Sequence, residues 1–338
     1  MRRTLPWLAA ALALLALPAR AALQVDTLAA TASLPPHVLS AFDDPLGFER
    51  QPDGSYVVFD QRGHTVYAVD AARDAVRTLV AIGQEEGRII EPRGFDTGAD
   101  GRFVVADAPR GVERLQTFGP DGRRLAGFTL PGRPTMSVSD GGWVLSGVGT
   151  VQLTPRGTLL LSLPESGALF TEYSIGGRPQ RGIGVLRETG YEDQRDLHMA
   201  MNAGFPLVDP TGGYYFVFAA GAPRFRKYDA FGRLQFERHI EGRELDPLLA
   251  GLPQVWPTRD VDRREVPYVQ PTVRAAAVDA GGSLWVSLAV PYTYVYDSHG
   301  DKARTVQFRG AGIVSPASLS FAEGGRLLVT PGAYEFRP

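Results

Sequence analysis

One short pattern recurs six times along the 338-residue chain and limits what this chain can fold into. In each copy a turn containing glycine precedes an aromatic or aliphatic residue and a run of mostly apolar residues. The copies are DGSYVVFD from Asp53, DGRFVVAD from Asp100, GGWVLSG from Gly141, GGYYFVFA from Gly212, GGSLWVSL from Gly281 and GGRLLVTP from Gly324. Repetition of this kind indicates a fold built from similar units. The 39 glycines and 26 prolines also disfavour long helices.

Most copies are followed by a second pair of short segments in which apolar and polar residues alternate. Examples are 67–70, 225–229 and 294–297, each ending at an aspartate, and 151–153, which we expect to be the third strand of the third unit, after the turn at Gly141. Alternation with a period of two residues is typical of strands with one buried face. Each unit is therefore predicted to be four short antiparallel strands. Six such units predict an all-β protein, a six-bladed β-propeller.

The last copy favours a closed ring. After Gly325 only two strand-like segments, Leu327 to Thr330 and Ala333 to Arg337, remain before Pro338. We expect the apolar segment Leu23 to Leu28 to supply the missing fourth strand of the last blade. Closure of this kind removes the exposed sheet edges that an open ring would leave.

The second unit resembles the NHL repeat. The residues that carry the resemblance are Pro92-Arg93-Gly94-Phe95-Asp96, then Asp100 to Asp107, and then Arg114-Leu115-Gln116-Thr117-Phe118 with Asp121-Gly122. The first unit, from Pro45 to Leu79, is similar, whereas the other four keep only the glycine turn and the alternation. The resemblance implies a six-bladed ring that mostly serves as a recognition surface. Some relatives of this architecture act as lyases or lactonases.

The N-terminus has the three parts of a secretory signal peptide. Arg2 and Arg3 are basic, residues 5–17 are apolar, and Ala19-Arg20-Ala21 is a small-x-small cleavage site. We expect residues 1–21 to be removed, leaving 22–338 as a single propeller domain without a transmembrane segment, in the periplasm or secreted. A net charge of -2 argues against a nucleic-acid partner. The absence of cysteine excludes disulfides and cysteine nucleophiles.

Two intervals between copies, around the fourth unit, are longer than the others. The extra segments, 176–205 and 243–270, are expected to lie together over one mouth of the central channel, where loops on a rigid scaffold often carry binding residues. The alternative is that they are solvated surface loops. The candidate ligand-binding residues are arginines near the starts of innermost strands, which could hold a carboxylate or phosphate, and polar residues of the first insertion. They are Arg93, Arg133, Arg178, Tyr191, His198 and Arg274.

Signals for catalysis are weak in this sequence. The five histidines are scattered without a spacing that would place two metal ligands on one element, and there is no Gly-x-Ser-x-Gly nucleophile motif. We therefore assign no catalytic residue and no metal ligand, and predict no cofactor. The expected function is binding of a protein, peptide or glycan by a monomer. The alternative is a lactonase-like hydrolase or lyase that uses a divalent metal, calcium or zinc, in the channel mouth.

Overall fold

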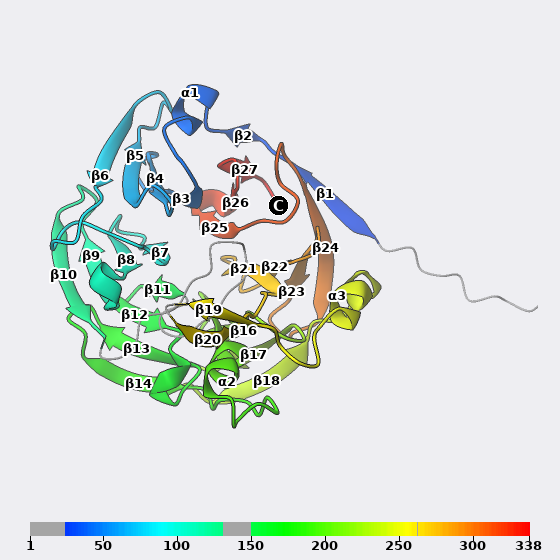
Figure 1. Ribbon diagram of the computed structural model, residues 1–338. Coiled ribbons are helices and arrows are strands. Elements are labelled where there is room, and N and C mark those ends of the chain that lie inside the picture. Colours follow the sequence, from blue (N-terminus) through cyan, green and yellow to red (C-terminus); the bar gives the residue numbers. More distant parts are fainter. Residues whose placement is uncertain (1–23, 131–149, 262) are drawn as a thin grey trace, which may run out of the picture.

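A computed structural model describes residues 24–130, 150–261 and 263–338 of the protein. Six antiparallel sheets stand around a central axis, each with its first strand innermost (Figure 1). The predicted six-bladed β-propeller is confirmed. No helix in the described ranges is long and apolar enough to cross a lipid bilayer.

Blades one to three come from three consecutive stretches of the chain. Blade one comprises β3 (Pro45–Arg50), β4 (Tyr56–Asp60), β5 (Thr65–Val69) and β6 (Val76–Val80). Blade two comprises β7 (Gly94–Thr97), β8 (Phe103–Asp107), β9 (Arg114–Phe118) and β10 (Arg124–Thr129). Blade three comprises β11 (Val151–Leu153), β12 (Thr158–Leu161), β13 (Phe170–Ser174) and β14 (Pro179–Ile183).

Blades four to six complete the ring. Blade four comprises β15 (Gly204–Val208), β16 (Tyr214–Phe218), β17 (Arg224–Tyr228) and β18 (Leu234–His239). Blade five comprises β21 (Val273–Val278), β22 (Leu284–Leu288), β23 (Thr293–Tyr296) and β24 (Lys302–Arg309), with β1 (Val25–Ala29) added outside β24. Blade six comprises β25 (Ser318–Ala322), β26 (Arg326–Thr330), β27 (Tyr334–Phe336) and β2 (Ala32–Ser33).

Short helices and one small hairpin lie in the connections. They are α1 (Pro36–Leu39), α2 (Arg195–Asn202), α3 (Asp246–Ala250) and the hairpin of β19 (Thr258–Val261) and β20 (Arg264–Pro267). The single-turn 3-10 segments are η1 (Pro109–Gly111), η2 (Pro164–Ser166), η3 (Arg243–Leu245) and η4 (Glu323–Gly325).

The register predicted for blade three was wrong. We expected 151–153 to be its third strand, following the glycine turn at Gly141, but this segment is the innermost strand β11. The turn of the innermost hairpin is instead at Gly157, which has a φ of +76°, and the copy at Gly141 lies outside the described residues. Both glycines are flanked by alternating residues, so the local pattern fits either register. Because the regular strands continue to Ile183, the segment added before β15 is 184–203.

An N-terminal strand closes the ring in the last blade, as predicted, but it is not the segment that we expected. Val25–Ala29 does not enter the last blade, because β1 pairs in parallel with β24 of blade five. The fourth strand of blade six is the next segment, Ala32–Ser33, which pairs with β27. Both the amide and the hydroxyl of Thr31 donate to the backbone oxygen of Glu335, at 2.8 and 3.0 Å. The N-terminal segment therefore joins two blades and not one.

The hydrophobic core is divided among the six interfaces between blades. In blade two, Phe103 and Val105 of β8 pack against blade one, whereas Val104 and Ala106 pack against blade three. Alternate side chains of a strand point to opposite faces of its sheet, so a strand between two neighbours is buried on both faces. This explains why the second strand of each repeat is an almost continuous apolar run.

Glu335 of β27 connects blade six to blade one. Its carboxylate accepts hydrogen bonds from the Tyr56 hydroxyl of β4, from Arg73 Nη2 at 2.7 Å and from Arg326 Nη1 at 3.1 Å. The Glu335 side chain is only 3% exposed. A buried carboxylate with three donors stabilises the interface where the ring closes, and removal of one partner leaves the others unpaired.

We expect Glu335→Ala to lower the free energy of unfolding by about 3 kcal/mol, because it leaves Arg73 and the Tyr56 hydroxyl without their acceptor. Urea denaturation would measure the change. Arg233→Ala is the matched control, because its ion pair with Asp229 is on the surface and the Arg233 side chain is 77% exposed. That control should cost less than about 0.5 kcal/mol. Equal losses in both variants would show that the Glu335 contacts do not hold the ring closed.

Candidate functional site

A cavity of about 580 Å³ follows the propeller axis, and its wall includes residues from all six innermost strands. Each of these strands begins where the chain arrives from the preceding blade, and the strands of each blade alternate in direction, so all six begin at the same end of the channel. We call this end the cap end, because both long insertions leave and re-enter the propeller there. Position along an innermost strand thus measures depth from the cap end.

Arg93 and Arg274 line the channel near its cap end. Arg93 directly precedes β7 of blade two, and Arg274 is the second residue of β21 in blade five, on the opposite side of the ring. Arg274 occupies a β-bulge, since Val273 pairs with Leu288 and Ala275 with Ser287. Bulges turn a side chain away from its regular position and often occur next to binding sites.

Arg93 has hydrogen-bonding capacity that the described residues leave unused. Its Nε and Nη1 atoms are buried and have no hydrogen-bond partner there, while Nη2 lies 4.0 Å from Glu91 Oε2. Burial lowers the pKa of Arg93 from its ordinary value, and the charges of Glu113 and Glu91 oppose that change. Arg274 is exposed and has no ion-pair partner in the described ranges. The Arg274 guanidinium is thus accessible to an anion in the channel, whereas Arg93 is a largely buried guanidinium in the channel wall with two unused donor atoms.

Two carboxyl groups lie deeper in the channel. Glu49 of β3 and Asp96 of β7 both line the cavity and occupy equivalent positions in their repeats, PLGFE and PRGFD. Glu49 Oε2 accepts a hydrogen bond from the Thr97 hydroxyl, and Asp96 Oδ2 accepts one from the backbone N–H of Leu153. Neither carboxyl forms a salt bridge with a basic side chain of the described residues.

The two carboxyl groups hold protons at higher pH than ordinary acids. Burial raises the pKa of Glu49 to about 7, although hydrogen bonds from Thr97 and Ser320 partly oppose the change. Burial, together with the negative charge of Glu49, raises the pKa of Asp96 well above its usual range. Two carboxyls that repel each other in a poorly solvated site titrate as a coupled pair.

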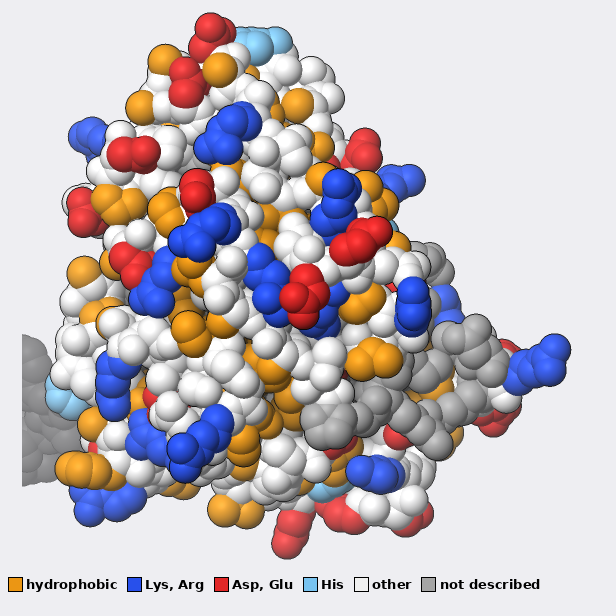
Figure 2. Space-filling view, turned by 90° about the vertical axis from the view of Figure 1, so that its left-hand side faces the viewer, with side chains coloured by type: hydrophobic (Ala, Val, Ile, Leu, Met, Phe, Trp, Pro, Cys, Tyr) orange, Lys and Arg blue, Asp and Glu red, His pale blue; other side chains and the backbone are white. Residues whose placement is uncertain are grey.

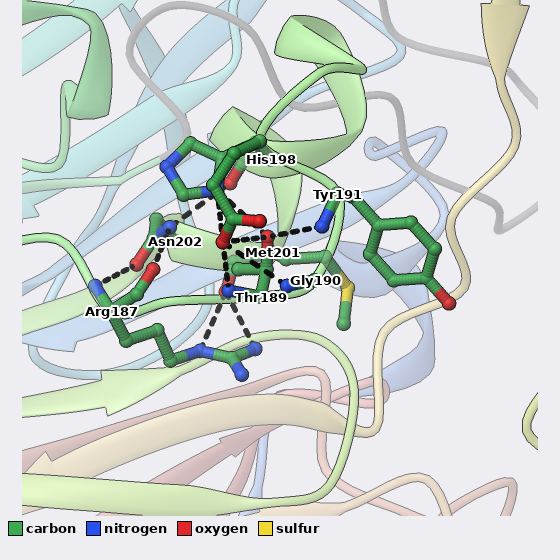
Figure 3. A network of polar contacts seen from close by, with 8 residues as sticks. Arg187, Thr189, Gly190, Tyr191, His198, Met201 and Asn202 are labelled. Carbon is green, nitrogen blue, oxygen red and sulfur yellow. Dashed lines mark hydrogen bonds and ion pairs between the residues drawn. The ribbon is translucent and has the colours of Figure 1, made fainter.

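The first insertion, 184–203, folds on itself at the cap end. Asn202 at the end of α2 accepts from the Arg187 amide at 2.8 Å, and its amide group donates to the Arg187 and His198 carbonyls. His198 Nδ1 lies 2.7 Å from the Thr189 hydroxyl (Figure 3). These contacts satisfy polar groups inside the insertion and fix its shape.

The second insertion packs against the first. Leu197 and Met201 of α2 share an apolar cluster with Trp256 and Val269, and the Tyr191 hydroxyl donates to the Gln254 carbonyl at 3.3 Å. Phe205 borders this cluster and also lines the channel. The two insertions therefore form one layer beside the channel mouth at blade four, with the β19–β20 hairpin on it (Figure 1).

The predicted site residues fall into separate places. Arg93 and Arg274 both line the channel, from opposite blades, whereas Tyr191 and His198 hold the insertion layer together and are not in the cavity wall. Arg178 is not near the start of an innermost strand: it lies in the turn between β13 and β14, at the end of the propeller opposite the cap end. The shift of register in blade three is the reason. Arg133 lies outside the described residues.

Sequence reasoning missed Glu49 and Asp96. The signal was present, because an acid follows Pro-x-Gly-Phe in both of the first two repeats. Isolated acids in a repeat are usually explained by turn capping, and nothing local shows that these two face the same cavity. No group of three or more His, Cys, Asp or Glu side chains in the described ranges is arranged to hold a metal ion.

The outer flank of the ring differs from the channel. On the flank that includes β6 and β10, basic and acidic side chains are both spread over the surface (Figure 2). Mixed charge of this kind is ordinary for a solvated surface.

No protein-family model matches this sequence, and no curated protein matches it. Solved structures do match. Virginiamycin B lyase from Staphylococcus aureus is 9% identical with a TM-score of 0.53, covering 88% of this chain and 80% of that one. A streptogramin B lyase structure is 10% identical with a TM-score of 0.52, covering 86% and 76%. At such identities the likeness shows the fold alone: this chain is a β-propeller protein.

The pH dependence of stability should reveal the buried carboxyl pair. A carboxyl whose pKa is higher in the folded protein binds more protons there, so stability falls as pH rises from the unfolded pKa of 4.5 to the folded pKa of about 7. Glu49→Gln removes this effect. We expect it to match the native protein near pH 4 and to exceed its free energy of unfolding by up to about 3 kcal/mol at pH 8.

Urea denaturation at several pH values would measure the difference between the two proteins. Glu323→Gln is the control, because Glu323 is exposed in the β25–β26 turn. It should follow the native protein at every pH. A constant difference between Glu49→Gln and the native protein from pH 4 to 8 would contradict a raised pKa at Glu49.

Proposed function

We propose that the protein is an exported binding module whose ligand presents an anionic group to Arg93 and Arg274 at the cap end of the channel. The observation that carries this proposal is the Arg93 guanidinium in the wall of a cavity that all six blades line, with two nitrogens that have no hydrogen-bond partner among the described residues. Unused buried donors are costly, and a bound carboxylate or phosphate would satisfy them.

Arginine suits this role because its planar guanidinium donates two parallel hydrogen bonds to a carboxylate or phosphate. Two arginines from opposite blades can contact the same anion from both sides of the mouth. The insertion layer, fixed by the contacts of Asn202 and His198, provides a rigid border on one side. A preorganised site of this kind loses less entropy when the ligand binds.

Two sequence features support the wider setting of the proposal. Residues 1–21 have the composition of a secretory signal, which supports export to the periplasm or the medium. Blade two resembles the NHL repeat, whose propellers mostly serve recognition. Lyase activity cannot be inferred for this chain from the lyase structures that share its fold, because fold alone does not determine function.

Small anions should stabilise the native protein and depend on both arginines. We would measure thermal unfolding in acetate, succinate, citrate and inorganic phosphate at constant ionic strength. An anion at one hundred times its Kd adds about 2.7 kcal/mol to the stability of the folded state. We expect at least one of the four to raise the Tm, and Arg93→Ala/Arg274→Ala to lose that rise.

Arg178→Ala is the matched control, since Arg178 is an exposed arginine at the opposite end of the propeller. It should keep the full response. The proposal is wrong if none of the four anions raises the Tm of the native protein, or if the rise persists in the double variant.

A further inference from the structure

The charged side chains in the channel wall are sorted by depth. The two arginines stand at the cap end, whereas Glu49 and Asp96 stand further along the innermost strands. The titratable side chains of the wall are these four and Asp44, which is next to the start of β3. The wall therefore holds two arginines and Asp44 near the cap end, whereas its titratable groups further along are the carboxyls of Glu49 and Asp96.

The carboxyl groups lie in one layer that spans three neighbouring blades. Ser320 of blade six donates to Glu49 of blade one, and Glu49 accepts from Thr97 of blade two, next to Asp96. Hydroxyl groups hold Glu49 and a backbone N–H holds Asp96, and none of these donors neutralises the carboxyl charges. The Phe95 ring, stacked on Phe59 at 5.0 Å, also fixes the strand between Arg93 and Asp96. A small positive group of a ligand that reached this layer could bind the carboxylates of Glu49 and Asp96. No basic side chain of the described residues is paired with either carboxylate.

The spacing between the two ends is set by strand geometry. Arg93 and Asp96 are three residues apart on one strand, which places their Cα atoms about 10 Å apart. An extended tripeptide has about the same length between its terminal amino and carboxylate groups. Leu46, Leu153 and Leu319 supply apolar wall for small side chains between the two ends.

We propose that the channel binds short zwitterions, of which a tripeptide with free termini is the model, with the carboxylate at Arg93 and Arg274 and the ammonium at Glu49 and Asp96. This rests on the proposed function, because it uses the same arginines and adds the second end of the ligand. The raised pKa values of the two acids agree with it, since each records a carboxyl that lacks a positive neighbour.

The test uses three matched probes at pH 7.5, where most peptide α-amino groups are protonated and most Glu49 carboxyls are ionised: trialanine, N-acetyl-trialanine and trialanine amide. Isothermal titration calorimetry on the mature chain measures each Kd. Trialanine keeps both charges, the acetylated peptide keeps only the carboxylate, and the amide keeps only the ammonium. We expect trialanine to bind at least about tenfold more tightly than either of the other two peptides. Loss of one charge-assisted hydrogen bond weakens binding by about this factor.

Variants assign the two ends of the peptide. In Glu49→Gln/Asp96→Asn, trialanine and N-acetyl-trialanine should bind equally, because the ammonium no longer gains a charged partner. In Arg93→Ala/Arg274→Ala, trialanine should bind no more tightly than trialanine amide. Glu323→Gln is the control for the acids and should keep the native preference for trialanine.

The outcomes separate this inference from the proposed function. If trialanine and N-acetyl-trialanine bind the native protein equally, or if trialanine does not bind while one of the small anions does, the ammonium site is wrong and the anion site stands. If trialanine binds tenfold more tightly but the double acid variant keeps that preference, the ammonium lies elsewhere and the inference is also wrong. If neither the peptides nor the anions bind, both proposals fail.

Discussion

The structure depends on one constraint: each blade can bury its apolar residues only against its two neighbours. The second strand of blade two faces blade one with Phe103 and Val105 and blade three with Val104 and Ala106. A single blade would leave both of these faces exposed, so stability comes from the interfaces and not from the sheets. The last interface, between blades six and one, must therefore form as well as the others. Here the chain uses its N-terminal segment, in which β1 extends blade five and β2 completes blade six.

Among the described residues, ionic contacts of the same composition recur at three interfaces. Each contains a basic side chain, a carboxylate and a tyrosine hydroxyl. Arg73, Glu335 and Tyr56 connect blades six and one, and Arg181, Glu172 and Tyr214 connect blades three and four. Lys227, Asp209 and Tyr215 all belong to blade four. They reach blade five through hydrogen bonds from Lys227 and Tyr215 to the backbone oxygens of Ser298 and Gly282. A buried ion pair is weak evidence for added stability, but it disfavours misaligned packing because each misplaced partner is left unpaired. In a ring of similar blades, we infer that these contacts help to align each blade with the next.

The architecture was predictable from sequence because the repeat signal is redundant, whereas its details were not. Six copies of a glycine turn sufficed for the blade number even though one copy, at Gly141, is outside the described residues and blade three begins later than expected. Closure failed in detail because Val25–Ala29 and Ala32–Ser33 are both short and either could fill an open edge. The candidate site was harder to predict from the sequence than the fold. Arg93 and Arg274 were found because they are near strand starts, but Arg178 depended on a wrong register. Glu49 and Asp96 were not predicted, because only the folded structure shows that these two distant residues line the same cavity.

The innermost strands are where a propeller can hold polar groups at low cost to its fold. An innermost strand pairs with only one other strand, so its free edge faces the axis. Glu49 and Asp96 line the channel and also accept hydrogen bonds across blade interfaces, from the Thr97 hydroxyl of blade two and the Leu153 N–H of blade three. Gly47 and Phe95 pack against each other so tightly that a Cβ on Gly47 would lie 2.6 Å from the Phe95 ring. In the repeats PLGFE and PRGFD, glycine and phenylalanine thus serve the packing between blades one and two, and the acid that follows them brings a polar group to the channel wall.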